Sequence, residues 1–160
     1  MAKFEWDSSI ELGIPAIDEQ HKALFGWVNE LNDSVMRGDG SETVADLIWN
    51  LITYVTEHFT AEEQLMLACS YPGLASHRKE HDQFVERLRN IQVEFIDGHR
   101  MSEKILDFLV DWLVCHIKGT DQSYSLHMRK QGGELFADNR PAIMSATLMP
   151  STAELMIPPA

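Results

Sequence analysis

The sequence predicts an all-α fold: an antiparallel up-down-up-down four-helix bundle with an N-terminal arm and a C-terminal extension. Apolar residues recur at steps of three and four in four successive segments, which is the spacing of one face of a helix. Only a few residues separate neighbouring segments, and short connections favour antiparallel helices. No segment with the alternating pattern of a strand competes for the core.

The first predicted helix follows an irregular arm. Residues 1–17 mix aromatic residues with Gly13 and Pro15, a composition typical of irregular structure. Asp18 is the expected N-cap, because its short carboxylate can accept a hydrogen bond from a free amide of the first turn. The apolar stripe then continues to Gly38, where we expect the helix to end.

The other three predicted helices have similar start and stop signals. The second is expected to begin with Ser41 as its N-cap and to end at the Tyr71-Pro72-Gly73 break. The third follows that break and ends at Gly98. The fourth is capped by Ser102 and ends at Gly132-Gly133.

Residues 1–131, with the arm at 1–17, are expected to form one bundle domain. Residues 132–160 form a non-periodic C-terminal extension, in which four prolines stand among small and apolar residues. We expect this extension either to be disordered or to dock along the bundle as an apolar strap.

Composition and charge restrict the function. The chain has 160 residues, of which 44% are apolar and 24% charged, as expected of one globular domain. Its net charge of −12 would repel nucleic acid and anionic membranes, so neither is an expected partner. There is no signal-peptide pattern, no apolar stretch long enough to span a membrane, and only two cysteines, so we expect a cytoplasmic protein.

Six polar side chains occupy the apolar stripes instead of the polar faces. Burying an ionised group without a partner costs on the order of several kcal/mol, so six such residues require a common explanation. In the predicted topology all six lie at one end of the bundle. They are His21, His58, Glu62, His77, His81 and His116.

Two pairs among these residues have the spacing of metal ligands. His58 and Glu62 are four residues apart, as are His77 and His81. Residues four apart project from one helical face a single turn from each other, near enough to share a metal ion. Adjacent helices could bring both pairs together.

The fourth helix adds a carboxylate through an irregularity. Asp121 follows His116 by five residues, which on a regular helix would turn its carboxylate away from the histidine. The apolar positions slip by one residue in the same place, next to Gly119. We therefore predict a π-bulge between His116 and Asp121, and such bulges are frequent at functional sites.

The complete set of donors is suited to iron. Five imidazoles and two carboxylates without a thiolate form a nitrogen and oxygen site, too large for one ion. Two octahedral irons joined by two carboxylates and a bridging oxide or hydroxide would keep one open position, which could hold a small molecule such as dioxygen. The expected walls of this oxygen pocket are apolar: Leu24, Phe25, Phe59, Leu113 and Ile117.

Four segments resemble the signature of the hemerythrin family. They are Asp18-Glu19-Gln20-His21, His58-Phe59-x-x-Glu62, His77-x-x-x-His81 and Trp112-Leu113-x-x-His116-Ile117-x-x-x-Asp121. The resemblance covers about residues 4–131, and the length and turns are similar to those of bacterial hemerythrins. It implies reversible binding of dioxygen at a non-haem di-iron centre, for storage, transport or delivery.

The resemblance also implies a role for each donor. One iron would be bound by three histidines and the other by two, with Glu62 and Asp121 as bridges. Trp112 would join the oxygen pocket. The histidines of the first iron would be His77, His81 and His116, and those of the second His21 and His58.

Two other classes of function remain open. One is a di-iron enzyme, such as an oxidase, a peroxidase or a nitric-oxide reductase. The paired Glu-x-x-His motifs of ferritin-like oxidases are missing at the matching places, so we expect a protein that is not an enzyme. The other class is a sensor of oxygen or iron that acts through a partner. For an oxygen carrier the partners would be dioxygen and a protein that receives it.

Five further residues are expected to lie outside the centre. Glu63 follows Glu62 but faces about 100° away on a helix, so we expect it to be solvated. His99 and His127 are expected at the surface. Cys69 and Cys115 are expected to be small residues in or near the core.

Overall fold

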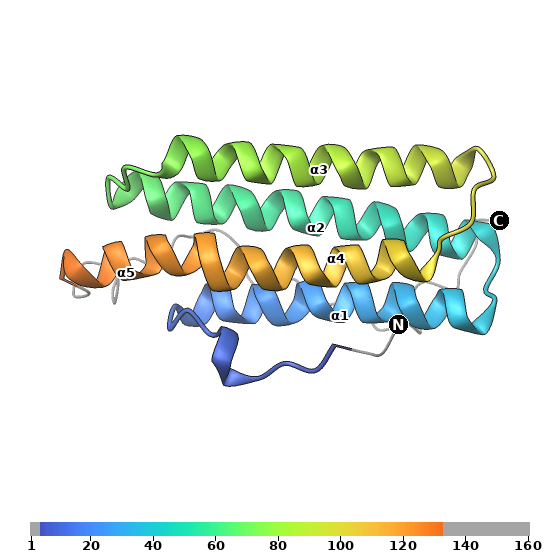
Figure 1. Cartoon of the computed structure of the whole chain (residues 1–160), viewed down its shortest axis with the longest axis horizontal. Helices are drawn as coiled ribbons and strands as arrows, with labels where there is room; N and C mark the ends of the chain where they lie inside the picture. Colours follow the sequence, from blue (N-terminus) through green and yellow to red (C-terminus); the bar gives the residue numbers. More distant parts are fainter. Residues whose placement is uncertain (1–3, 133–160) are drawn as a thin grey trace, which may run out of the picture.

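Four helical rods lie side by side and alternate in direction (Figure 1). The structure is a computed structural model that describes residues 4–132. The rods are α1 (Pro15–Arg37), α2 (Ser41–Ala68), α3 (Leu74–Ile96) and a fourth rod built from α4 (Glu103–His116), the π-helical turn η2 (Ile117–Asp121) and α5 (Gln122–Lys130). This arrangement confirms the all-α, up-down-up-down bundle. The expectation for the C-terminal extension concerns residues outside the described range.

The start of α1 differs from the prediction. The helix begins at Pro15, and its N-cap is Ile14. Proline is well placed there because the first helical position needs no backbone N–H donor. Asp18 lies in the first turn, where its two carboxylate oxygens accept hydrogen bonds from the N–H groups of Leu12 (2.7 Å) and Gly13 (3.0 Å). Asp18 therefore ties the arm to the helix instead of capping it.

Of the other predicted caps, one is wrong and two are confirmed. Gly40 is the N-cap of α2 and Ser41 is already helical, so the predicted serine cap is one residue out. Ser102 caps α4, with its hydroxyl oxygen accepting a hydrogen bond from the N–H of Ile105. Gly38 ends α1 with a φ of 73°, a left-handed conformation that suits glycine.

The predicted π-bulge is present. Residues Ile117–Asp121 form one π-helical turn, and the backbone on both sides of it stays helical, so α4, η2 and α5 make one continuous rod. The extra residue in this turn keeps Asp121 buried. It also brings Tyr124 and Met128 of α5 onto the buried face, which is the change of register that the apolar pattern indicated.

The arm is held against α1 more firmly than its irregular composition suggested. It contains the 3₁₀ turn η1 (Ser8–Ile10) and runs beside α1 (Figure 1). The Phe4 ring stacks on Phe25 with 3.8 Å between ring centroids. Asn29 forms two hydrogen bonds with the Phe4 backbone, of 2.8 and 2.9 Å. Both the apolar contact and the paired polar groups keep this part of the arm in place.

Each rod buries an apolar face and exposes a polar one. The buried faces of all four rods, together with Ile10 and Leu12 of the arm, form one core. None of the helices within residues 4–132 is both apolar enough and long enough to cross a bilayer.

Candidate metal centre

All seven predicted ligands gather at one level of the bundle, toward the end where α2 turns into α3. They come from all four rods, so no single helix builds the centre. Each is buried, with at most 5% of its surface exposed. The seven are His21 of α1, His58 and Glu62 of α2, His77 and His81 of α3, His116 of α4 and Asp121 of η2.

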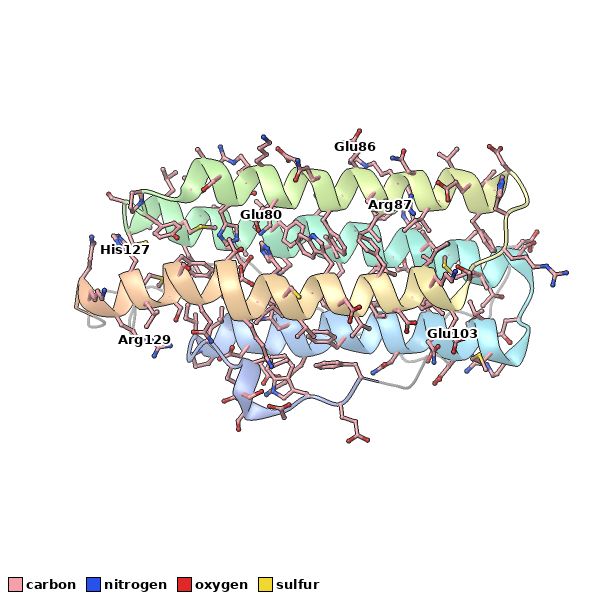
Figure 2. The ribbon with its side chains drawn as sticks, in the orientation of Figure 1. Glu80, Glu86, Arg87, Glu103, His127 and Arg129 are labelled. Atoms are coloured by element: carbon pink, nitrogen blue, oxygen red, sulfur yellow. The ribbon has the colours of Figure 1, made fainter. Side chains whose placement is uncertain are left out.

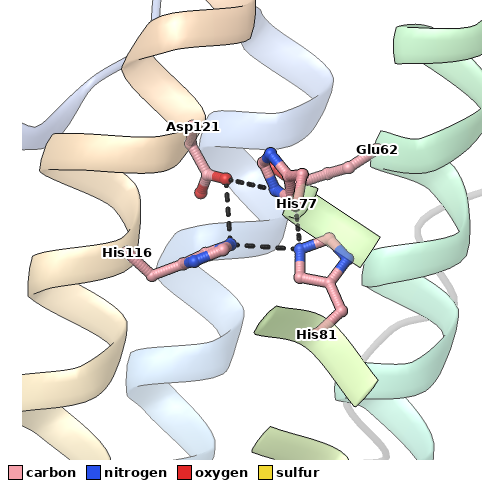
Figure 3. A group of neighbouring side chains, drawn as sticks. All are labelled: Glu62, His77, His81, His116 and Asp121. Carbon is pink, nitrogen blue, oxygen red and sulfur yellow. Dashed lines mark hydrogen bonds and ion pairs between the residues drawn. The ribbon is translucent and has the colours of Figure 1, made fainter. Parts of the chain in front are cut away.

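Five of these side chains form a group that we call the three-histidine half (Figure 3). The Nε2 atoms of His77 and His116 each lie 3.1 Å from Oδ1 of Asp121. The Nε2 atom of His81 lies 3.0 Å from Nε2 of His116 and 3.3 Å from Oε2 of Glu62. Three ring nitrogens and two carboxylates therefore converge on one small volume.

His21, His58 and Glu62 form the adjoining two-histidine half. The Nε2 atom of His21 lies 3.7 Å from Oε1 of Glu62 and 3.4 Å from Oδ2 of Asp121. The Nε2 atom of His58 lies 3.6 Å from Oε2 of Glu62. Asp121 thus turns one oxygen toward each half, and Glu62 has nitrogen neighbours in both.

Several buried atoms of the centre have no hydrogen-bond partner within residues 4–132. They include both ring nitrogens of His21 and of His77, one oxygen of Glu62 and both oxygens of Asp121. Buried polar atoms in proteins almost always have a partner. Donor atoms that crowd together and remain unpaired are what a metal site requires, so these residues fit a metal.

The contact between His81 and His116 leads to the same conclusion. Nδ1–H of His81 donates to Oε1 of Glu63 (3.0 Å), and Nδ1–H of His116 donates to Oε2 of Glu80 (3.1 Å). Since a neutral imidazole carries one hydrogen, both Nε2 atoms are left with bare lone pairs, 3.0 Å apart. Two ligands at right angles, each about 2.1 Å from one ion, would also be about 3.0 Å apart.

Glu63 is not solvated as predicted. Only 19% of its side chain is exposed, and it lies between His81 and Arg78, whose Nε is 2.7 Å from Oε2. A helical rotation of 100° from Glu62 moves it off the core stripe but still leaves it facing α3. The prediction was wrong because the next helix covers that direction.

Three other polar residues that contact the centre were missed from the sequence. Oε1 of Gln20 accepts a hydrogen bond of 2.8 Å from Nδ1–H of His58, and Glu80 holds His116. The Tyr124 hydroxyl donates to Oε1 of Glu62 at 2.8 Å. Tyr124 continues the apolar stripe and so signals only a core position. For Gln20 and Glu80 the contacts cross between helices, where no spacing signal exists.

Burial and charge act differently on the two histidines of the two-histidine half. Burial lowers the pKa of His58 to about 3. Burial also opposes protonation of His21, but the nearby carboxylates of Asp121 (3.4 Å) and Glu62 (3.7 Å) outweigh it and raise its pKa to about 9. Burial raises the pKa of the Tyr124 hydroxyl, and the charge of Glu62 adds to this effect, so Tyr124 remains a hydrogen-bond donor.

Two of the expected pocket residues contact the histidines directly. The Phe59 ring stacks on His81 with 3.7 Å between centroids and 2° between planes. The Trp112 ring stacks on His116 at 4.4 Å and 14°. Both contacts limit rotation of the imidazoles. The other four expected pocket residues are buried in the core: Leu24, Phe25, Leu113 and Ile117.

The remaining histidines and cysteines lie outside the two halves. His99 is exposed, as predicted. His127 is half-buried and donates through Nε2 to the carbonyl oxygen of Cys69 (3.1 Å), so the prediction of a surface residue holds only in part. Cys69 is buried as expected, but Cys115 is exposed because the core face of α4 passes through Leu113 and His116 on either side of it.

Comparison with known proteins identifies the family. The profile described as "Hemerythrin HHE cation binding domain" matches residues 12–125. The chain belongs to the hemerythrin family. Among similar hemerythrins, the bacteriohemerythrin of Stenotrophomonas maltophilia is 32% identical over 78% of this chain and 81% of its own length. The myohemerythrin of Theromyzon tessulatum is 35% identical over 76% of this chain and 90% of its own length.

A solved structure agrees in fold and coverage. The crystal structure of wild-type hemerythrin superposes with a TM-score of 0.74 and 31% identity, and it covers 79% of this chain and 98% of the matched one. Membership of the hemerythrin family and the buried cluster of histidine, glutamate and aspartate side chains both fit a metal centre.

Proposed function

We propose that this hemerythrin binds dioxygen reversibly at two iron ions, for storage, transport or delivery. The observation that carries the proposal is the pair of adjoining buried ligand groups with Glu62 and Asp121 between them. Iron bound there would supply the electrons and the open coordination position that dioxygen binding requires. The ligands would be His77, His81, His116, Glu62 and Asp121 for one ion, and His21, His58 and both carboxylates for the other.

The surrounding side chains would hold the ligands still and exclude water. Phe59 and Trp112 stack on His81 and His116, and apolar core residues close the sides of the centre. Dioxygen is small and uncharged, so it could reach a site that excludes water-soluble substrates. A dry pocket with rigid ligands favours binding and release of the gas.

The position of Tyr124 supports binding over turnover. Oxygen activation usually requires a group that delivers protons. Tyr124 is fully buried, and its hydroxyl proton is already engaged by Glu62. Its raised pKa makes this hydroxyl a weak acid, so it is poorly suited to deliver that proton.

Repeated oxygen cycling tests this function. The iron-loaded protein is reduced without air, exposed to dioxygen and then freed of it, while its absorption spectrum is followed. We expect the starting spectrum to return over several cycles. A His99→Ala variant should cycle in the same way because His99 is exposed, whereas His58→Ala should lose iron and fail to cycle. Irreversible oxidation with release of hydrogen peroxide would support an enzyme instead.

A further inference from the structure

In the three-histidine half, two histidines donate a hydrogen bond from their remote ring nitrogen to a carboxylate. His116 donates through Nδ1–H to Glu80 at 3.1 Å, and His81 donates to Glu63 at 3.0 Å. Such a carboxylate fixes the ring tautomer and makes the other nitrogen a stronger electron donor to a metal. The two carboxylates belong to Glu80 and Glu63, and neither residue is an expected metal ligand.

In the two-histidine half, neither remote ring nitrogen is hydrogen-bonded to a carboxylate within residues 4–132. His58 donates through Nδ1–H to the amide oxygen of Gln20 at 2.8 Å. The Nδ1 atom of His21 has no hydrogen-bond partner within residues 4–132. The two halves therefore differ in the charge behind their histidines as well as in the number of histidines.

Glu80 carries the less compensated of the two carboxylate charges. Arg78 lies 2.7 Å from Glu63 and offsets its charge, whereas the only ion pair of Glu80 among residues 4–132 is with His116. The hydroxyl of Thr120 donates to the same Oε2 atom of Glu80 at 2.8 Å. Thr120 belongs to the π-helical turn, so the irregularity that turns Asp121 inward also helps to orient Glu80. Figure 2 shows Glu80 between α3 and α4.

We propose that Glu80 is a positioning residue that acts through His116, and that Glu80 and Glu63 make the three-histidine half the tighter metal site, which fills first. This inference rests on the ligands named in the proposed function. Loss of such an outer hydrogen-bond partner typically lowers metal affinity by about 10–100-fold. The side chain of Glu80 is 44% exposed, so its replacement should not disturb the core.

A zinc titration of the metal-free protein tests the inference without iron or oxygen. Calorimetry should give two binding steps of unequal affinity. Glu80→Ala should weaken the first step by about 10–100-fold and leave the second unchanged. Glu80→Gln should have an intermediate effect, because the amide oxygen can still accept the hydrogen bond but carries no charge. The control is Glu94→Gln, since Glu94 also lies on α3 but pairs with the partly buried Arg87.

A second measurement separates the hydrogen bond from a general structural effect. In the zinc-loaded protein, the Nδ1 proton of His116 should give a downfield, slowly exchanging NMR signal. The signal should be absent in Glu80→Ala and present in Glu80→Gln, in which the amide oxygen still accepts the hydrogen bond. The reciprocal variant Gln20→Glu should tighten the second step, because it places a carboxylate behind His58.

The outcomes distinguish this inference from the proposed function. A wild-type protein that takes up fewer than two zinc ions would contradict the ligand assignment and with it the proposed function. Two ions bound with equal affinity, or an unchanged first step in Glu80→Ala, would overturn only the inference. Glu80→Gln binding as tightly as wild type would also overturn it, since the charge would then have no role.

Discussion

Asp121 shows how a single side chain can join two ligand groups. Its Oδ1 atom lies 3.1 Å from His77 and from His116, and its Oδ2 atom lies 3.4 Å from His21. Neither oxygen has a hydrogen-bond partner within residues 4–132. Burial opposes ionisation of this carboxyl, but the close imidazole rings of His116, His21 and His77 outweigh it and lower its pKa. The negative charge so maintained suits a cation.

Replacement of Asp121 by alanine should reduce the iron content below two ions per chain. The substitution removes one ligand from each half, so both ions lose affinity. Elemental analysis of protein purified from iron-supplemented cells measures the effect. Asp111→Ala removes an exposed carboxylate from α4 and should leave the iron content unchanged. Two irons in Asp121→Ala would contradict the bridging role.

Replacement of Tyr124 by phenylalanine should destabilise the metal-free protein by about 1–3 kcal/mol. The hydroxyl donates to a buried oxygen of Glu62, and that oxygen would lose its donor. Urea unfolding at neutral pH measures the change in free energy. The matched variant Tyr54→Phe, at a half-buried position, should change stability by less than about 0.5 kcal/mol. Equal effects of the two variants would refute the importance of this bond.

At the scale of elements, the π-helical turn η2 decides which residues of the fourth rod face the core. A regular helix would turn Asp121 away from His116, and the extra residue corrects this. The same turn brings Thr120 within 2.8 Å of Glu80. One local change in hydrogen-bond register thus turns the expected ligand Asp121 inward. It also places Thr120 where it orients Glu80, the hydrogen-bond partner of the expected ligand His116.

Gly119 stands inside this turn but is not required for it. Its φ is not in the left-handed region, and a Cβ atom added there would meet open space. We therefore expect Gly119→Ala to stabilise the protein by about 0.5–1 kcal/mol, because alanine loses less backbone entropy on folding. The iron content should not change. Urea unfolding and elemental analysis test both expectations.

Gly38 is the matched control for this substitution. A Cβ atom there would also meet open space, but its φ is 73°. Alanine in that left-handed conformation should cost roughly 1–2 kcal/mol. The two variants should therefore change stability in opposite directions. If Gly119→Ala destabilises the protein as much as Gly38→Ala, the π-helical turn depends on glycine after all.

At the scale of the whole molecule, the topology brings the expected ligands to one level. α1 and α3 contribute residues near their starts, while α2 and the fourth rod contribute residues toward their ends. Because neighbouring rods run in opposite directions, these positions meet near one end of the bundle (Figure 1). The charges gathered there make the stability of the metal-free bundle depend on pH.

The pKa values of His58 and His21 shift in opposite directions and should reduce stability on the acid side and on the alkaline side, respectively. The pKa of His58 falls from 6.5 to about 3 in the folded protein, so its contribution to the free energy of unfolding is complete above pH 6.5 and is lost as the pH falls toward 3. The pKa of His21 rises from 6.5 to about 9, so its contribution is complete below pH 6.5 and is lost as the pH rises through 9. From these two groups, the metal-free protein should be most stable near pH 6.5.

Urea midpoints of the metal-free protein between pH 4 and pH 10 measure this dependence. His58→Gln should flatten the acid limb and His21→Gln the alkaline limb. His99→Gln replaces an exposed histidine and should leave both limbs in place. A stability that does not change across this range would contradict the proton affinities inferred for the two buried histidines.

For the helical stripes and the spacing of the expected ligands, the sequence was sufficient because these signals lie within one helix. The stripes of apolar residues, the four-residue spacing of His77 and His81, and the register slip before Asp121 depend only on the geometry of a single helix. The slip predicted the π-helical turn because an extra residue changes every later position in the same way. Connection lengths then sufficed for the topology and for the end of the bundle where the centre lies.

Contacts between helices could not be predicted in the same way. The partners of the remote histidine nitrogens, Gln20, Glu63 and Glu80, belong to helices other than those of the histidines they hold. Their meeting depends on the rotation and height at which the rods pack, and these quantities follow from the fit of the whole core. A residue such as Glu63 therefore has the pattern of a solvated side chain until the neighbouring helix covers it.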